Sequence, residues 1–187
     1  ITGLFASVII IYERQVLHHA YGPTTLISYF IYSQIFYSAP AMITAAYFTY
    51  AVPKAYAAPI NRKSHIKSFS AILLIHIASG ILIALIIGRF WTNLYPDLSG
   101  FDIYFAALLV FYSLSTSLLQ WVIILLTKKG HLRKIILITV AKNIMFGISI
   151  FYMQYTSITF YPAFLTLCSL ICCLIAVYTP KHRWANR

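Results

Sequence analysis

Long apolar runs separated by short polar connections dominate the pattern of this chain. Six runs follow one another, and they cover residues 1–12, 24–52, 68–91, 103–127, 135–156 and 158–179. Apolar runs of roughly 18 or more residues are typical of helices that cross a bilayer, and the last five runs lack the strict alternation of barrel strands. The pattern therefore predicts an all-α integral membrane fold, a single transmembrane unit over residues 1–187 that ends in a basic tail at 180–187.

The two N-terminal runs differ most from the rest in length. Run 1–12 is too short to cross a bilayer, so we expect a truncated helix and a chain that continues upstream. Run 24–52 lies between a Gly22-Pro23 turn and a Pro53-Lys54 break, and as one helix it would measure about 43 Å against a hydrocarbon core of roughly 30 Å. Tilt, a kink at Pro40 or a protruding helix end can absorb that surplus.

The composition supports the same class. The chain is 61% hydrophobic and only 9% charged, with a mean hydropathy of +0.82, whereas soluble domains carry about a quarter charged residues. The net charge of +11 raises the possibility of nucleic-acid binding, but the basic residues sit in short clusters between apolar runs, as membrane orientation requires. We therefore expect the lipid bilayer, and no nucleic acid, as a partner.

The basic residues also predict an orientation. Eleven Lys and Arg residues fall in segments 53–67 and 128–134 and in the tail, which alternation places on one side of the membrane. The other side holds only Arg14 and Arg89, together with all three acidic residues. Because short cytoplasmic loops carry the excess of Lys and Arg, we expect a multi-pass protein of the cytoplasmic (inner) membrane with its C-terminus in the cytoplasm.

Polar residues recur every three or four positions inside the runs, so each run has a polar face. The residues that mark these faces most clearly are Tyr29 and Tyr37 in run 24–52, His76 in run 68–91, Tyr112 and Gln120 in run 103–127, and Lys142 and Asn143 in run 135–156. Such faces either pack helix against helix or line a polar cavity, and both alternatives stay open. We take these seven residues as the candidate substrate-binding set.

Lys142 is the sharpest candidate, because it lies eight residues beyond Lys134, hence about 12 Å into its helix. A charge at that depth either marks a functional site or snorkels back to the headgroups, and the sequence does not decide between these alternatives. In a cavity, its ammonium would attract phosphate. For His76, a neutral hydrogen-bonded histidine is favoured over proton coupling or a polar substrate contact.

Other chemistry has little support. Glu13, Arg14, His18 and His19 could bind a metal by spacing, but a solvated loop is favoured over a metal site. The sequence has no nucleophile elbow, HExxH, P-loop or glycine-rich dinucleotide turn. We therefore expect a transporter rather than an enzyme, with no cofactor and no metal. The cysteines Cys168, Cys172 and Cys173 all lie in the last run and are expected to be packing residues.

Three stretches resemble the polysaccharide flippases, the O-antigen (Wzx-type) branch of the MOP exporter superfamily. They are YGPTTLISYFIYSQIF, AVPKAYAAPINRK and LLQWVIILLTKKGHLRK, of which the last resembles a tenth helix with its short basic turn. The resemblance implies that the chain is the C-terminal half, a six-helix lobe with its first helix truncated, whose N-terminal six-helix lobe lies upstream. The chain departs from the family in having no acidic residue within the expected spans, so no carboxylate ion site is expected in this half.

The resemblance also implies a cargo, an undecaprenyl-diphosphate-linked oligosaccharide that crosses by alternating access of two lobes. From the face analysis, Lys142 would offset the diphosphate charge, and Tyr29, Tyr37 and Tyr112 could contact sugars. Alternatives are a MOP-type exporter with another cargo, such as a drug or the peptidoglycan precursor, or a membrane enzyme of polysaccharide assembly (a polymerase or glycosyltransferase).

Overall fold

A computed structural model shows a bundle of long helices and describes residues 2–57, 62–96, 98, 100–153 and 155–178. The elements are α1 (Thr2–Tyr32), the π-helix η1 (Ser33–Ser38), α2 (Ala39–Ala57), α3 (Arg62–Leu94), α4 (Ile103–Lys128), α5 (Leu132–Met153) and α6 (Phe160–Tyr178). All regular structure in this part of the chain is helical, which confirms the all-α prediction. The predicted basic tail, 180–187, lies outside the described residues.

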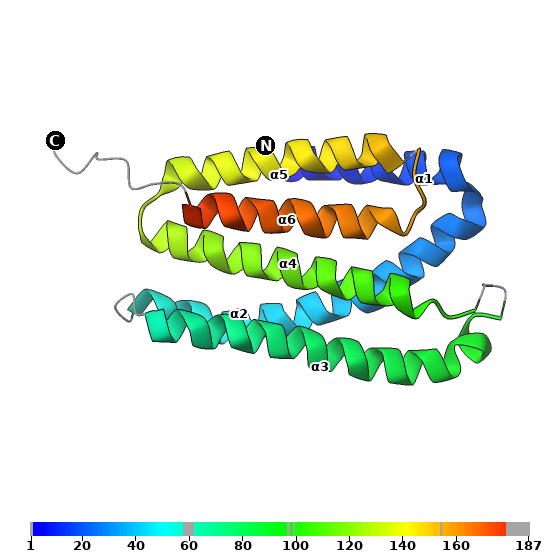
Figure 1. The fold of residues 1–187 in the computed structure, drawn as a ribbon, viewed down its shortest axis with the longest axis horizontal. Coiled ribbons are helices and arrows are strands. Elements are labelled where there is room, and N and C mark those ends of the chain that lie inside the picture. Colours follow the sequence, from blue (N-terminus) through cyan, green and yellow to red (C-terminus); the bar gives the residue numbers. More distant parts are fainter. Residues whose placement is uncertain (1, 58–61, 97, 99, 154, 179–187) are drawn as a thin grey trace.

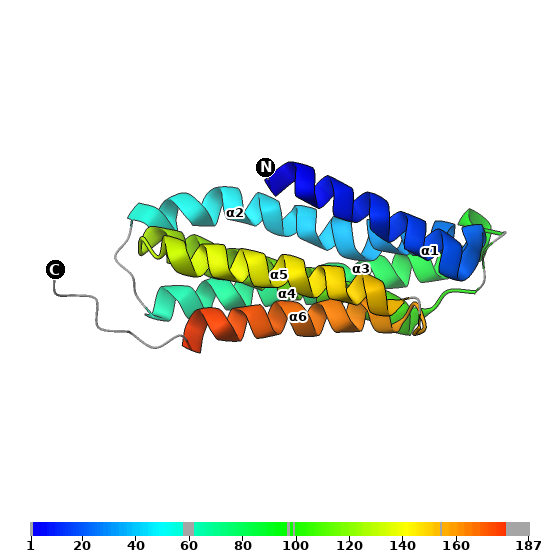
Figure 2. The same ribbon diagram turned by 90° about the horizontal axis from the view of Figure 1, so that it is seen from above.

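Helix α4 occupies the middle of the bundle. In Figure 1 it lies between α6 on one side and α2 with α3 on the other, and it contacts all of these helices as well as η1 and α5. Figure 2 shows α1 and α2 together on one side of α5 and α6. Helix α4 is therefore covered by protein on several sides, which explains why it has the largest set of buried side chains among the described helices.

The described helices are long and apolar enough to cross a membrane. Four segments meet that description, Ile11–Ala57, His65–Leu94, Ile103–Lys128 and Leu132–Met153, and a shorter apolar helix covers Phe160–Ala176. Large aliphatic side chains are exposed on the outside of the bundle, as on α3, where Leu74 is 65% and Leu85 68% exposed. A continuous apolar surface of this kind is stable against lipid and not against water, so the architecture indicates a membrane protein.

The first predicted boundary was wrong. We expected a truncated helix over 1–12 followed by a polar connection, but α1 continues through Glu13 and Arg14 to a kink at Gly22. The physical reason is that residues 4–21 contain neither glycine nor proline, so nothing breaks the backbone where the charges begin. The charged pair therefore lies on a helix rather than in a loop.

Gly22 has φ 81° and ψ 172°, which confirms the turn predicted at Gly22-Pro23. Beyond it the chain folds back, so that the hydroxyl of Tyr29 donates a hydrogen bond to Glu13 Oε1 at 3.0 Å. In a straight helix, 16 residues would separate the two positions by about 24 Å. We call this end of the bundle the kink end.

The remaining predicted runs required smaller corrections. The run 24–52 does not stop at Pro53, which lies inside α2. Helix α3 is longer at both ends than the predicted 68–91, α5 begins and ends three residues earlier than 135–156, and α6 begins at Phe160 rather than 158. Prediction and structure agree best for α4, where the Asp102 carboxylate caps the helix by accepting a hydrogen bond from the Phe105 amide at 3.0 Å.

The basic connections meet at one end of the bundle, opposite the kink end. Helix α2 ends there beside the end of α4, and the ammonium of Lys128 donates a hydrogen bond to the carbonyl of Ala55. Lys54 and Lys128 therefore lie at the same end, as alternating topology requires. We call this the basic end.

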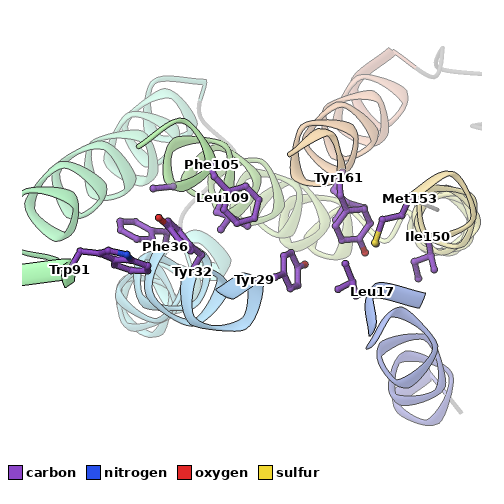
Figure 3. Packing of buried hydrophobic residues seen from close by; sticks show 12 residues of the cluster. Leu17, Tyr29, Tyr32, Phe36, Trp91, Phe105, Leu109, Ile150, Met153 and Tyr161 are labelled. Atoms are coloured by element: carbon purple, nitrogen blue, oxygen red, sulfur yellow. The ribbon is translucent and has the colours of Figure 1, made fainter. Parts of the chain in front are cut away.

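The kink end holds the largest core of buried side chains. Figure 3 shows aromatic residues from α1, η1, α3, α4 and α6 packed there, among them Tyr32, whose ring centre lies 4.6 Å from that of Trp91. Two smaller cores lie toward the basic end, one between α4, α5 and α6 and the other between α2, α3 and α4. A pocket lies between these packed regions.

Candidate functional site

A cavity of about 370 Å³ opens midway along the bundle. It lies within the range of roughly 300–1,000 Å³ that is typical of ligand pockets. Its lining combines charged, amide, hydroxyl and aromatic side chains: Glu13, Arg14, Tyr29, Phe30, Ser33, Gln34, Tyr37, Ser38, Leu109, Tyr112, Lys142, Asn143, Phe146 and Leu165. We call it the central cavity.

Five of the seven candidate residues lie together in the lining of this cavity. They are Tyr29, Tyr37, Tyr112, Lys142 and Asn143, which come from three predicted runs. The rings of Tyr37 and Tyr112 stack, with centres 4.8 Å apart and planes at 21°. The polar faces of α1, η1, α4 and α5 therefore converge on one space.

The π-helix η1 supplies four of the lining residues: Ser33, Gln34, Tyr37 and Ser38. Pro40 follows it and has no N–H, so an α-helical hydrogen bond to the carbonyl of Phe36 cannot form. A π-helical turn is a common way for a helix to accommodate such a break, and these turns are frequent at functional sites. The surplus length of run 24–52 is thus absorbed partly by this wide turn before Pro40.

Lys142 lies at mid-depth in the bundle. It is ten residues from Leu132 and eleven from Met153, hence about 15 Å from the start of α5 and about 16 Å from its end. Its side chain is partly buried and lines the central cavity, and within the described residues its ammonium has no ion-pair or hydrogen-bond partner. A cation in this place can bind an anionic ligand.

Sequence reasoning missed Glu13 and Arg14 as cavity residues. The Glu13 carboxylate accepts the hydrogen bond from Tyr29, and the Arg14 guanidinium lies 4.8 Å from the centre of the Phe30 ring. With Lys142 they give the cavity lining a formal charge of +1. The candidate span Ile11–Ala57 includes Glu13, so the expectation of no acidic residue within the spans was wrong. The absence of any helix breaker between residues 4 and 21 was the available signal.

Gln120 and His76 lie outside the central cavity. Gln120 is exposed and lines a neighbouring cavity of about 270 Å³, which shares Tyr37 and Lys142 with the central one. His76 is fully buried between α2, α3 and α4, with Nδ1 2.9 Å from the Ile72 carbonyl. The polar face of α3 thus serves helix packing, because its histidine meets hydroxyls of α2 and α4 instead of the cavity.

No match was found. No family model matches the chain, and neither a curated protein nor a solved structure is detectably similar to it. The function therefore has to be argued from the cavity itself.

The central cavity has groups that can bind an anionic ligand. Two cations, stacked aromatic rings and neutral amides can hold an anion with attached polar groups. The predicted alternative of a metal at Glu13 and the two histidines has no geometric support, since the described residues contain no group of three ligands that could hold a metal ion. His18 and His19 are exposed and contact each other edge to face.

Proposed function

We propose that the chain is one six-helix lobe of a two-lobed flippase of the MOP type, and that it moves lipid-linked oligosaccharide across the cytoplasmic membrane. The resemblance of the Gly22-Pro23 and Pro53-Lys54 regions to O-antigen flippases supports this family. In this proposal, the other lobe precedes the chain in the full-length protein, and rocking of the two lobes exposes the cavity to each side in turn. The cargo is an undecaprenyl-diphosphate-linked repeat unit whose lipid tail remains in the bilayer.

The observation that carries the proposal is the position of Lys142 in the central cavity at mid-depth. A charge in the middle of a bilayer is costly, so it persists where it faces water, a partner or a ligand. Snorkelling toward the basic end would relieve the cost only if the ammonium left the cavity, whose lining it forms. A diphosphate that crosses the membrane needs a cation at this depth, and Lys142 supplies it.

The central cavity also has side chains that can contact the sugar part of the cargo. The stacked rings of Tyr37 and Tyr112 offer flat apolar faces beside hydroxyl groups, and Asn143 offers an amide donor and acceptor. These groups carry no charge, so they bind hydroxyl-rich molecules with moderate affinity. Such moderate contacts suit a carrier, which must release what it binds.

The proposed orientation predicts the accessibility of single cysteines. Lys129, in the turn after α4, and Tyr155, after α5, are both exposed and lie at opposite ends of the bundle. In intact cells, a membrane-impermeant maleimide should label Tyr155→Cys and should label Lys129→Cys only after permeabilisation. The native cysteines are replaced by alanine beforehand. The reverse labelling pattern would place the basic end outside and reject the orientation.

Transport by the full-length protein tests the role of Lys142. In proteoliposomes, Lys142→Met should slow the flipping of undecaprenyl-diphosphate-linked oligosaccharide about tenfold or more, because loss of about 1.4 kcal/mol of binding to the diphosphate is a tenfold change. Lys142→Arg keeps the charge and should retain most of the rate. The matched control is Lys67→Met, which removes an exposed lysine near the basic end and should transport normally. Normal flipping by Lys142→Met would remove the cation from the mechanism.

Glu13 favours a second candidate, an exporter of cationic compounds, because its carboxylate also lines the central cavity. The two functions depend on different charged residues: export of a cation requires Glu13, and flipping of a diphosphate requires Lys142. Export of a cationic dye should fail in Glu13→Gln and persist in Lys142→Met, whereas flipping of a diphosphate should show the greater dependence on Lys142. Measurement of both cargoes with both variants separates the candidates.

A further inference from the structure

A second polar cavity, which we call the kink-end pocket, lies beyond Tyr29 at the kink end. Its volume is about 340 Å³, and it is lined by Thr24, Thr25, Ser28, Tyr29, Tyr32, Leu98, Asp102, Phe105, Ile158 and Thr159. Tyr29 lines both this pocket and the central cavity, so its ring forms part of the wall between them. Figure 3 shows Tyr29 beside Phe105 and Leu109, facing the space below Tyr161.

Three hydroxyls in this pocket are available to bind a ligand. At several other helical positions, Ser and Thr hydroxyls donate to a carbonyl three or four residues earlier, as those of Thr49 and Thr166 do. Within the described residues, the hydroxyls of Thr24, Thr25 and Ser28 have no hydrogen-bond partner. For the two threonines the reason is the kink at Gly22, which turns the preceding carbonyls away from this helical segment.

The charge of the pocket argues against phosphate. Asp102 is the charged residue in the described lining, and its carboxylate repels an anion. Tyr29, Tyr32 and Phe105 add aromatic surface beside the free hydroxyls, a combination that suits a neutral molecule with many hydroxyl groups and apolar C–H faces. The central cavity, with its two cations, suits the diphosphate instead.

We propose that the kink-end pocket binds neutral sugar residues of the cargo, on the far side of Tyr29 from the diphosphate. The choice of a sugar as the ligand rests on the proposed function. Thr25 and Ser28 provide the hydrogen bonds, and the aromatic rings provide the stacking surface. The oligosaccharide then extends from Lys142 toward the kink end, past Tyr29.

Direct binding of a neutral trisaccharide tests this site without a transport assay. Maltotriose and N,N′,N″-triacetylchitotriose are the probes, and saturation-transfer NMR with the full-length protein in nanodiscs, free of sugar-based detergent, measures the dissociation constant. Thr25→Val combined with Ser28→Ala should weaken binding at least fivefold. Thr49→Val is the matched control, because it removes an exposed hydroxyl of α2 that already has a partner, and it should bind as the wild type does.

Each result decides the proposal. Wild-type affinity in the double variant, or no binding of either probe to the wild type, would overturn the site. If the double variant is not folded by its thermal melting curve, the single variant Thr25→Val replaces it and should also weaken binding, because it removes one of the two hydrogen-bonding hydroxyls. The function fails separately: no flipping of undecaprenyl-diphosphate-linked oligosaccharide by the wild type, with trisaccharide binding that still depends on Thr25 and Ser28, would keep this pocket and reject the flippase.

Discussion

The His76→Ala variant should unfold with a free energy about 3 kcal/mol lower than the wild type. His76 is fully buried, and its Nδ1 donates to the Ile72 carbonyl at 2.9 Å, which leaves Nε2 as the acceptor. Nε2 lies 3.3 Å from the hydroxyls of Ser113 and Ser117. Ser113 donates its proton to the Tyr37 carbonyl at 2.8 Å, so Ser117 donates to the ring.

Two contributions add up to this loss. The side chain joins α3 to Thr44 of α2 and to Ser117 of α4, and interhelical hydrogen bonds in membrane proteins contribute about 0.6 kcal/mol each. Truncation of a fully buried ring also leaves a cavity, and comparable large-to-small changes cost about 2–5 kcal/mol. The cavity is therefore the larger contribution, and His76→Leu should recover about half of the lost stability because it fills the space.

Thermal or denaturant unfolding in detergent measures the change. His131→Ala is the control, because His131 is exposed in the turn before α5 and its removal should change stability by less than about 0.5 kcal/mol. Equal stability of the two alanine variants would contradict the packing described for α3. Because Ser113 also contacts Tyr37 of η1, loss of His76 should lower transport as well, through the shape of the central cavity.

The sequence predicted a helix well where an apolar run ends at clear capping and turn residues. Run 103–127 matches α4 because both ends carry clear signals, the Asp102 cap and the Lys128–Gly130 turn. The prediction was wrong at Glu13, because this charge was interpreted as the end of the first apolar run. The carboxylate is tolerated inside the helix because Tyr29, far along the chain, donates a hydrogen bond to it, and a contact of that kind is not visible in local sequence.

The candidate site was predictable as a set of polar faces but not as an arrangement. Lys142, Asn143, Tyr37 and Tyr112 could be placed on helix faces from their spacing, and the structure brings them around one cavity. Spacing could not separate a face that lines a cavity from one that packs, so His76 was grouped with them. His76 packs against α2 and α4 and does not line the central cavity. The identity of its neighbouring helices depends on the arrangement of the whole bundle, which residue spacing does not reveal.

Gly22→Ala should destabilise the protein by about 1–3 kcal/mol, because φ 81° with ψ 172° is a conformation open almost only to glycine. A Cβ at this position would meet no atom within 4 Å, so the loss would come from backbone strain and not from a clash.

Gly147→Ala is the matched control for this strain. Position 147 also leaves open space around a Cβ but lies inside α5, so stability should be unchanged or rise by up to about 1 kcal/mol. Unfolding of the two variants under the same conditions measures the difference. If Gly22→Ala is as stable as Gly147→Ala, the kink does not need this conformation.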